Sequence, residues 1–111
     1  MEKVAVIHTA FEDKPSTVAF VDVPEFPTLI EKLEYAYRWT NNVMGSWSIK
    51  KELFDDGEPN GDFNPNVKVM APLHEGGMGL RSTSVGDQML VGNKKYVVAM
   101  MGFETLEGEK V

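Results

Sequence analysis

The chain has no cysteine and only two histidines among its 111 residues. Without cysteine there can be no disulfide and no zinc site of the cysteine type. The absence of disulfides fits a reducing compartment, and we therefore expect a cytoplasmic protein. The two histidines, His8 and His74, stand alone in the sequence, so the sequence predicts no metal site and no metal cofactor.

Long apolar runs are also missing. The first eleven residues, MEKVAVIHTAF, include charged and polar groups, so we expect neither a signal peptide nor a membrane span. The formal net charge is −6, and an acidic surface repels phosphate backbones, which disfavours a nucleic-acid partner. Acidic residues gather at 55–58 and in the tail, 104–111, and both stretches are predicted to be solvated.

In other respects the composition is that of an ordinary globular protein. Hydrophobic residues make up 42% of the chain and charged residues 25%. A chain of this length forms one domain, residues 1–111, and buries roughly 65% of its unfolded surface.

The first half predicts two strands and a helix. Residues 4–11 and 17–23 are rich in β-branched side chains and are separated by a turn cluster, which indicates an antiparallel hairpin. Thr28 and Glu31 have the spacing of a capping box, and apolar spacing then predicts a helix over 29–40. The asparagines at 41–42 are expected to end the helix, because asparagine tolerates the left-handed conformation.

The second half predicts three strands after an irregular loop at 44–66. Residues 67–73 form the first, and Gly92-Asn93 joins 88–91 to 95–103 in a hairpin. The run 95–103 is apolar on both faces, so we expect a central strand. The order β-β-α-β-β-β predicts an α+β fold. It has a single antiparallel, or mixed, sheet of about five strands with one main helix on one face.

A hydroxyl-rich stretch, Arg81-Ser82-Thr83-Ser84, is the candidate ligand site. Arginine presents a planar fork to phosphate or carboxylate, so these residues could bind a small anion such as a nucleotide. The alternative is structural: the hydroxyl groups bond nearby backbone and hold a turn, with Gly86 and Asp87, before the last hairpin.

Aromatic residues near the helix form the candidate interface: Tyr35, Trp39 and Trp47, with Arg38. Exposed aromatic residues and arginine anchor protein interfaces. The alternative is that the segment 44–54 folds over the helix and buries them. The seven methionines are expected to fill the core, with adaptable interface surface as the second interpretation.

No catalytic constellation is complete. Ser82 or Ser84 could be combined with His74 and Asp87 into a hydrolase triad, but the Gly-x-Ser-x-Gly elbow is absent. A small hydrolase built around His74 therefore stays the third hypothesis, behind protein binding and anion binding.

Three stretches together carry a family resemblance: Trp39-Thr40-Asn41-Asn42, Gly45-Ser46-Trp47, and the run from Arg81 to Asp87 that leads to Tyr96 and Gly102-Phe103. The chain resembles small uncharacterised proteins of tailed bacteriophages, and its C-terminal half is similar to YodL-like domains of mobile elements. The resemblance implies a phage or mobile-element protein that works in an infected bacterial cytoplasm. It carries over no catalytic role.

The lack of a complete catalytic constellation and the spare aromatic residues predict a non-enzymatic protein that binds another protein or a second copy of itself. The resemblance implies a phage accessory protein whose partner is a host protein, in host takeover or counter-defence.

Overall fold

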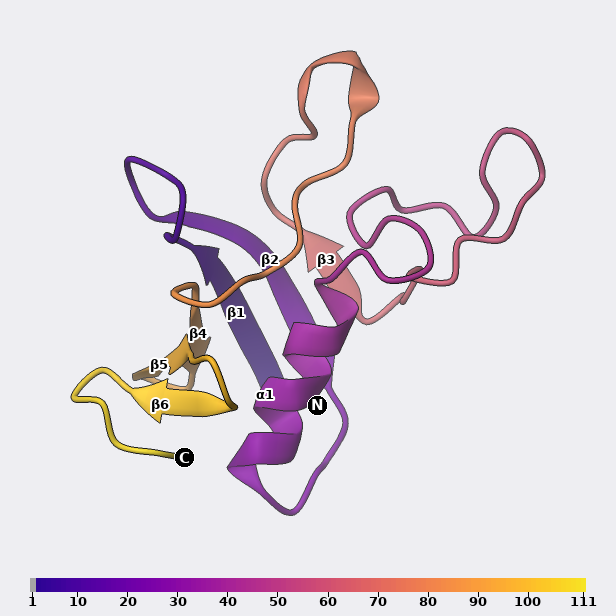
Figure 1. The fold of residues 1–111 in the computed structure, drawn as a ribbon. Coiled ribbons are helices and arrows are strands. Elements are labelled where there is room, and N and C mark those ends of the chain that lie inside the picture. The colour runs from indigo at the N-terminus through magenta and orange to yellow at the C-terminus, as the bar shows by residue number, and fades with distance from the viewer. Residues whose placement is uncertain (1) are drawn as a thin grey trace.

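Six strands form one antiparallel sheet in the computed structural model, which describes residues 2–111 (Figure 1). The order across the sheet is β3-β2-β1-β4-β5-β6. The predicted α+β class with one helix is confirmed, and the sheet has one strand more than expected. The strands are β1 (Glu2–His8), β2 (Ser16–Val23), β3 (Val67–Val69), β4 (Gln88–Val91), β5 (Lys94–Val98) and β6 (Phe103–Thr105).

The N-terminal hairpin forms as the β-branched residues predict. β1 and β2 pair antiparallel, and β1 pairs on its other side with β4, so the first strand of the chain lies inside the sheet. Val4 and Val6 are fully buried there. The central position of β1 places the loop that follows His8 against the residues that precede β4.

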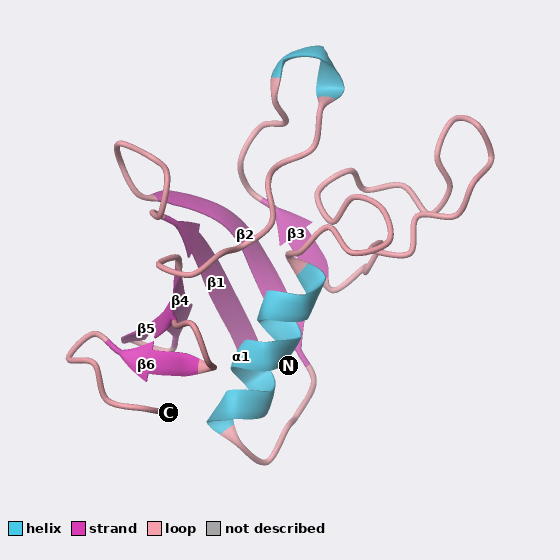
Figure 2. Cartoon of the chain, viewed as in Figure 1, coloured by secondary structure: helices cyan, strands magenta, loops and turns pink. Residues whose placement is uncertain are grey.

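Helix α1 (Leu29–Trp39) packs across β1 and β2 (Figure 2). Thr28 caps it as predicted: its hydroxyl accepts from the Glu31 N–H at 3.3 Å and donates to the Glu31 carboxylate at 2.7 Å. Leu33 and Ala36 are fully buried against the sheet. The helices of residues 2–111 are too short or too polar to cross a membrane.

The prediction that a left-handed asparagine ends α1 is wrong. No residue other than glycine has a positive φ in the described chain, Asn41 and Asn42 included. Instead the Asn41 side chain donates to the Tyr37 carbonyl, and it therefore satisfies one of the carbonyls that a helix end leaves without a partner.

The hairpin at Gly92 is confirmed, but the central strand 95–103 is wrong. β5 ends at Val98, and a turn at Met100-Met101 leads into β6. Gly102 has φ of 79° and its carbonyl accepts from the Ala99 N–H at 2.9 Å, which closes the turn. Glycine adopts that conformation without strain. The apolar run therefore turns back on itself, and the central strands are β1 and β4.

The methionine pair in this turn also departs from prediction. Met100 is 88% exposed and Met101 80% exposed, so neither fills the core. Met89 is the fully buried methionine of the described residues.

The prediction of a solvated tail at 104–111 is wrong for its first residues. Phe103–Thr105 is strand β6, and the last residues fold back along it. The Thr105 N–H donates to the Glu109 carbonyl at 2.8 Å, and the Val111 N–H donates to the Phe103 carbonyl at 3.1 Å. The end of the chain thereby shields the outer edge of β6.

The loop predicted at 44–66 has no regular structure but is tightly organised. The Asn60 amide donates to the carbonyls of Ser46, Ile49 and Lys51, and its oxygen accepts from the N–H groups of Ser46 and Asp62. Asp62 is fully buried. The loop is therefore built around polar side chains, whereas the acidic residues at 55–58 are exposed as predicted.

Candidate functional site

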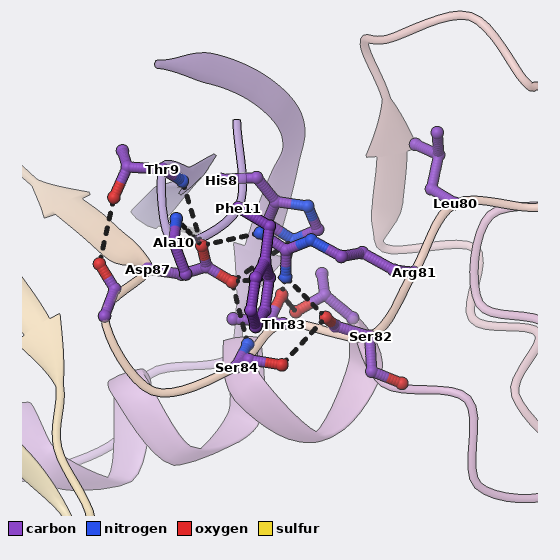
Figure 3. A network of polar contacts seen from close by, with 12 residues as sticks. His8, Thr9, Ala10, Phe11, Leu80, Arg81, Ser82, Thr83, Ser84 and Asp87 are labelled. Atoms are coloured by element: carbon purple, nitrogen blue, oxygen red, sulfur yellow. Dashed lines mark hydrogen bonds and ion pairs between the residues drawn. The ribbon is translucent and has the colours of Figure 1, made fainter. Parts of the chain in front are cut away.

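Polar side chains gather where β1 ends and the chain enters β4 (Figure 3). Segments far apart in the sequence meet at this point: the end of β1, the residue after α1, and the stretch 80–87. We call this group the His8 cluster. Its members are His8, Glu12, Thr40, Arg81, Thr83 and Asp87.

A chain of buried hydroxyl groups runs through the cluster. Thr40 donates to the Ala36 carbonyl at 2.7 Å, so its hydrogen is already used when Thr83 approaches at 2.8 Å. Thr83 must therefore donate to Thr40, and its oxygen accepts from His8 Nε2 at 3.0 Å. This order fixes His8 as the tautomer that carries its proton on Nε2. Burial lowers the pKa of His8, although the nearby Asp87 carboxylate opposes that effect.

Arg81 lies between two carboxylates. Its guanidinium makes two bonds to Glu12, at 2.9 and 3.1 Å, and two to Asp87, at 2.7 and 2.8 Å. The remaining N–H donates to the Ser82 carbonyl at 2.8 Å. All five donors of the side chain are therefore used within the protein. The hydrogen bond from Arg81 lowers the pKa of Glu12, and the hydrogen bond to Asp87 raises the pKa of Arg81.

Asp87 fastens the turn before β4 to the loop after β1. Its fully buried carboxylate accepts from the N–H groups of Thr9, Ala10 and Ser84 at 2.8–3.0 Å. Burial alone would raise the pKa of Asp87, but the bonds from Arg81 and from these N–H groups lower it to about 2. Gly86, with φ of 96°, occupies the turn position that requires a positive φ.

The stretches that carry the family resemblance interlock beside this cluster. The Trp47 indole donates to the Arg81 carbonyl at 2.9 Å. Asn42 accepts from the Trp47 N–H at 3.0 Å, and its own N–H donates to the Ser82 hydroxyl at 2.8 Å. Residues 42–47 and 81–82 thus hold each other in place over a sequence separation of about forty residues.

Arg81, the main residue of the predicted anion site, has no free N–H donor. The structure keeps Arg81, Ser82, Thr83 and Ser84 together, yet Thr83 is 1% exposed and Arg81 is neutralised by two carboxylates. Placing an anion there would require these bonds to break and would bring it next to like charges. The geometry is that of the structural alternative, in which the stretch holds the turn before the last hairpin.

The hydrolase arrangement is also not assembled. His74 is exposed and bonds by its backbone within its own loop, while both Asp87 oxygens are used by Arg81 and backbone N–H groups. Within the cluster, the nitrogen of His8 that faces Thr83 already carries its proton, so it cannot accept one from that hydroxyl. A cavity of about 440 Å³ is lined by His8, His74 and Ser16, but among the described residues no hydrogen bond joins the Ser16 hydroxyl to either histidine.

The predicted aromatic interface is corrected at Trp47. Trp47 is fully buried, because the segment 44–54 folds inward as in the alternative interpretation. Tyr35 is half-buried, and its hydroxyl accepts from the Asn64 and Asn66 amides at 3.0 Å. Arg38 and Trp39 stay partly exposed, with the guanidinium 4.1 Å from the indole ring centre.

A groove that the sequence did not indicate lies between α1 and the β5–β6 turn. Its volume is about 420 Å³, and its walls include Tyr37, Arg38, Met100 and Phe103. The exposed methionine turn forms one rim. The signal that could have revealed it is Gly102, since a glycine after two methionines indicates a turn rather than a continuing strand.

Comparison of the chain with family models, with curated proteins and with solved structures found no match. Residues 2–111 also contain no group of three or more histidine, aspartate or glutamate side chains placed to hold a metal ion.

Proposed function

We propose that this protein is a non-enzymatic accessory protein of a tailed bacteriophage that acts by binding a host protein in the infected bacterial cytoplasm. The resemblance stated above supports the phage setting and a role in host takeover or counter-defence. The His8 cluster supports a non-enzymatic role, because its polar groups are used to join segments of the fold.

The observation that carries the binding role is the exposed methionine turn beside the groove. Met100 and Met101 are the two most exposed large apolar side chains of the described chain. Methionine is enriched at interfaces and adapts its shape to a partner. Arg38, a predicted interface residue, lines the same groove. Tyr37 and Met100 line it too, so an apolar side chain of the partner in the groove would contact both of them.

The test is an affinity capture of tagged protein from the bacterial host. We expect a stoichiometric host protein with the unmodified chain and its loss with Met100→Asp/Met101→Asp. Because both side chains are exposed, the double variant should fold normally, which circular dichroism checks.

Met78→Asp is the matched control. Met78 is 68% exposed but lies in the loop before residue 80, away from the groove residues. Capture that survives in the double variant, or is lost equally in the control, would remove the groove from the binding role.

A further inference from the structure

The cavity of about 440 Å³ beside the His8 cluster is lined by residues of the β1–β2 hairpin and of the segment 71–81. The loop that follows β3 extends past the ends of the strands at this side of the molecule (Figure 1). Sites for small molecules have volumes of roughly 300–1,000 Å³, so the cavity is large enough for one. Five of its lining residues are apolar: Val18, Ala71, Pro72, Leu73 and Leu80.

His8 is the most deeply buried polar group of this lining, with a side chain that is 2% exposed. Its Nε2 donates to Thr83, because the hydroxyl chain through Thr40 fixes that tautomer. The other ring nitrogen, Nδ1, therefore has a lone pair and no proton. Burial lowers the pKa of His8, which keeps the ring neutral at neutral pH.

Nδ1 of His8 is a free hydrogen-bond acceptor that reaches the cavity. Within residues 2–111, the histidine ring bonds through Nε2 alone. The buried side-chain atoms without a partner in the same residues are Arg38 Nη1 and Asp62 Oδ1. Nδ1 is not one of them, so it touches open space, and the cavity is the open space that His8 lines. A ligand in the cavity that carries an N–H or O–H group thus meets a fixed acceptor.

The charges around the cavity favour a ligand that is positive. Glu12, Glu75 and Arg81 line it, and Asp87 binds Arg81 from behind. Three carboxylates therefore face one guanidinium, which is already paired with Glu12 and Asp87. Glu75 is exposed and forms no ion pair within the described chain, so its carboxylate is free to bind a cation.

We propose that this cavity binds a small organic amine in its protonated form. The ammonium group donates to His8 Nδ1 and lies near the Glu75 carboxylate, while the apolar part of the ligand contacts the apolar lining. The ligand is opposite in charge to the anion that the Arg81 stretch predicts, because internal carboxylates have already neutralised Arg81. The site is separate from the groove between α1 and the β5–β6 turn, so the proposal does not rest on the proposed function.

Nitrogen NMR of the histidine rings tests the acceptor directly. His74→Gln assigns the His8 signals, which should show a protonated Nε2 and an unprotonated Nδ1 at neutral pH. The probe is 2-phenylethylamine, which is a cation at that pH. It should shift the Nδ1 resonance upfield and saturably, with a dissociation constant on the order of 1 mM for so small a ligand. Nε2, whose partner is Thr83, should move much less.

Two comparisons test the charge of the ligand. Phenylacetate has the same ring but a carboxylate in place of the ammonium group, and it should leave Nδ1 unchanged. Glu75→Gln should weaken the binding of 2-phenylethylamine about threefold, as expected for an exposed ion pair. Glu58→Gln changes the net charge equally at an exposed position outside the cavity lining, and it should leave the affinity unchanged.

A proton on Nδ1 in the free protein would overturn the site, as would an Nδ1 signal that stays fixed at amine concentrations tenfold above the expected dissociation constant. Equal shifts from phenylacetate and the amine, or equal effects of Glu75→Gln and Glu58→Gln, would overturn the assignment to an amine. Met100→Asp/Met101→Asp should leave the binding of the probe intact, so this proposal and the proposed function can fail separately.

Discussion

At the scale of single residues, Thr83 is the central link of the polar network. It connects His8 to Thr40, and through Thr40 to the end of α1. Such a residue makes its contribution by pairing groups that would otherwise be buried without partners. Its effect should therefore exceed that of a hydroxyl on the surface.

We predict that Thr83→Val lowers the free energy of unfolding by about 1–3 kcal/mol, because it leaves the His8 N–H and a Thr40 lone pair without partners. Denaturant titration measures this loss. Thr17→Val, the same change at an exposed strand position, should stay within about 0.5 kcal/mol of the natural chain. Similar losses in the two variants would show that the hydroxyl chain contributes little.

The second residue-scale prediction concerns pH. Burial lowers the pKa of His8 in the folded chain, so the unfolded chain binds more protons as pH falls below about 6.5. Stability from this group is thus fully present above pH 6.5 and decreases below it. We expect the unfolding midpoint in denaturant to fall between about pH 6.5 and 5.

His8→Gln should flatten this dependence, since the glutamine amide can still donate to Thr83 but does not titrate. His74→Gln, at an exposed position outside the cluster, serves as control and should keep it. A slope that survives in His8→Gln would assign the pH dependence to other groups.

At the scale of elements, the loop after α1 contains no helix or strand, and hydrogen bonds to the Asn60 side chain hold its backbone instead. One amide bonds three carbonyls and two N–H groups of the loop backbone. Gly45 must be glycine for this reason, since a Cβ there would overlap the Asn60 side-chain oxygen. The loop therefore has a core of its own that is polar.

We predict that Asn60→Ala opens this loop before the rest of the molecule. Hydrogen exchange should accelerate in residues 44–62 and change little in β1 and β4, with a loss of roughly 2–4 kcal/mol in local stability. Asn93→Ala, in the exposed β4–β5 turn, is the matched control. Uniform acceleration across the chain would indicate that the loop unfolds only with the sheet.

The elements also show what sequence reasoning reaches. The cap at Thr28, the first hairpin and the turn at Gly92 were predictable, because each depends on neighbours a few residues away. The role of Arg81 was not, because its partner Glu12 lies 69 positions distant. The sequence around Arg81 looks the same whether the guanidinium binds a ligand or an internal carboxylate.

Composition misleads about burial in both directions for a similar reason. Asp62 and Asn60 have the composition of a solvated turn, yet they are buried: backbone groups of the loop bond the Asn60 amide and one Asp62 oxygen, and the Arg38 guanidinium lies 3.2 Å from the other Asp62 oxygen. Met100 and Met101 have the composition of a core strand, yet they are exposed because Gly102 permits a turn. Local patterns describe what a segment prefers, and the rest of the chain decides what covers it.

At the scale of the whole molecule, acidity is unevenly distributed. The chain carries a net charge of −6, yet by the strand register the sheet face opposite α1 carries three lysines and two acids: Lys3, Lys68, Lys95, Asp22 and Glu104. The remaining surface is correspondingly more acidic. An acidic exterior repels other copies of the chain.

The inner position of β1 governs the order in which the protein can fold during synthesis. β1 leaves the ribosome more than eighty residues before β4, which completes its pairing, and the N–H groups of Thr9 and Ala10 have no carboxylate partner until Asp87 is made. Until then the free edge of β1 can pair with other chains. We therefore infer that a nascent chain is most prone to aggregate until residue 91 has emerged, when β4 closes the sheet over that edge.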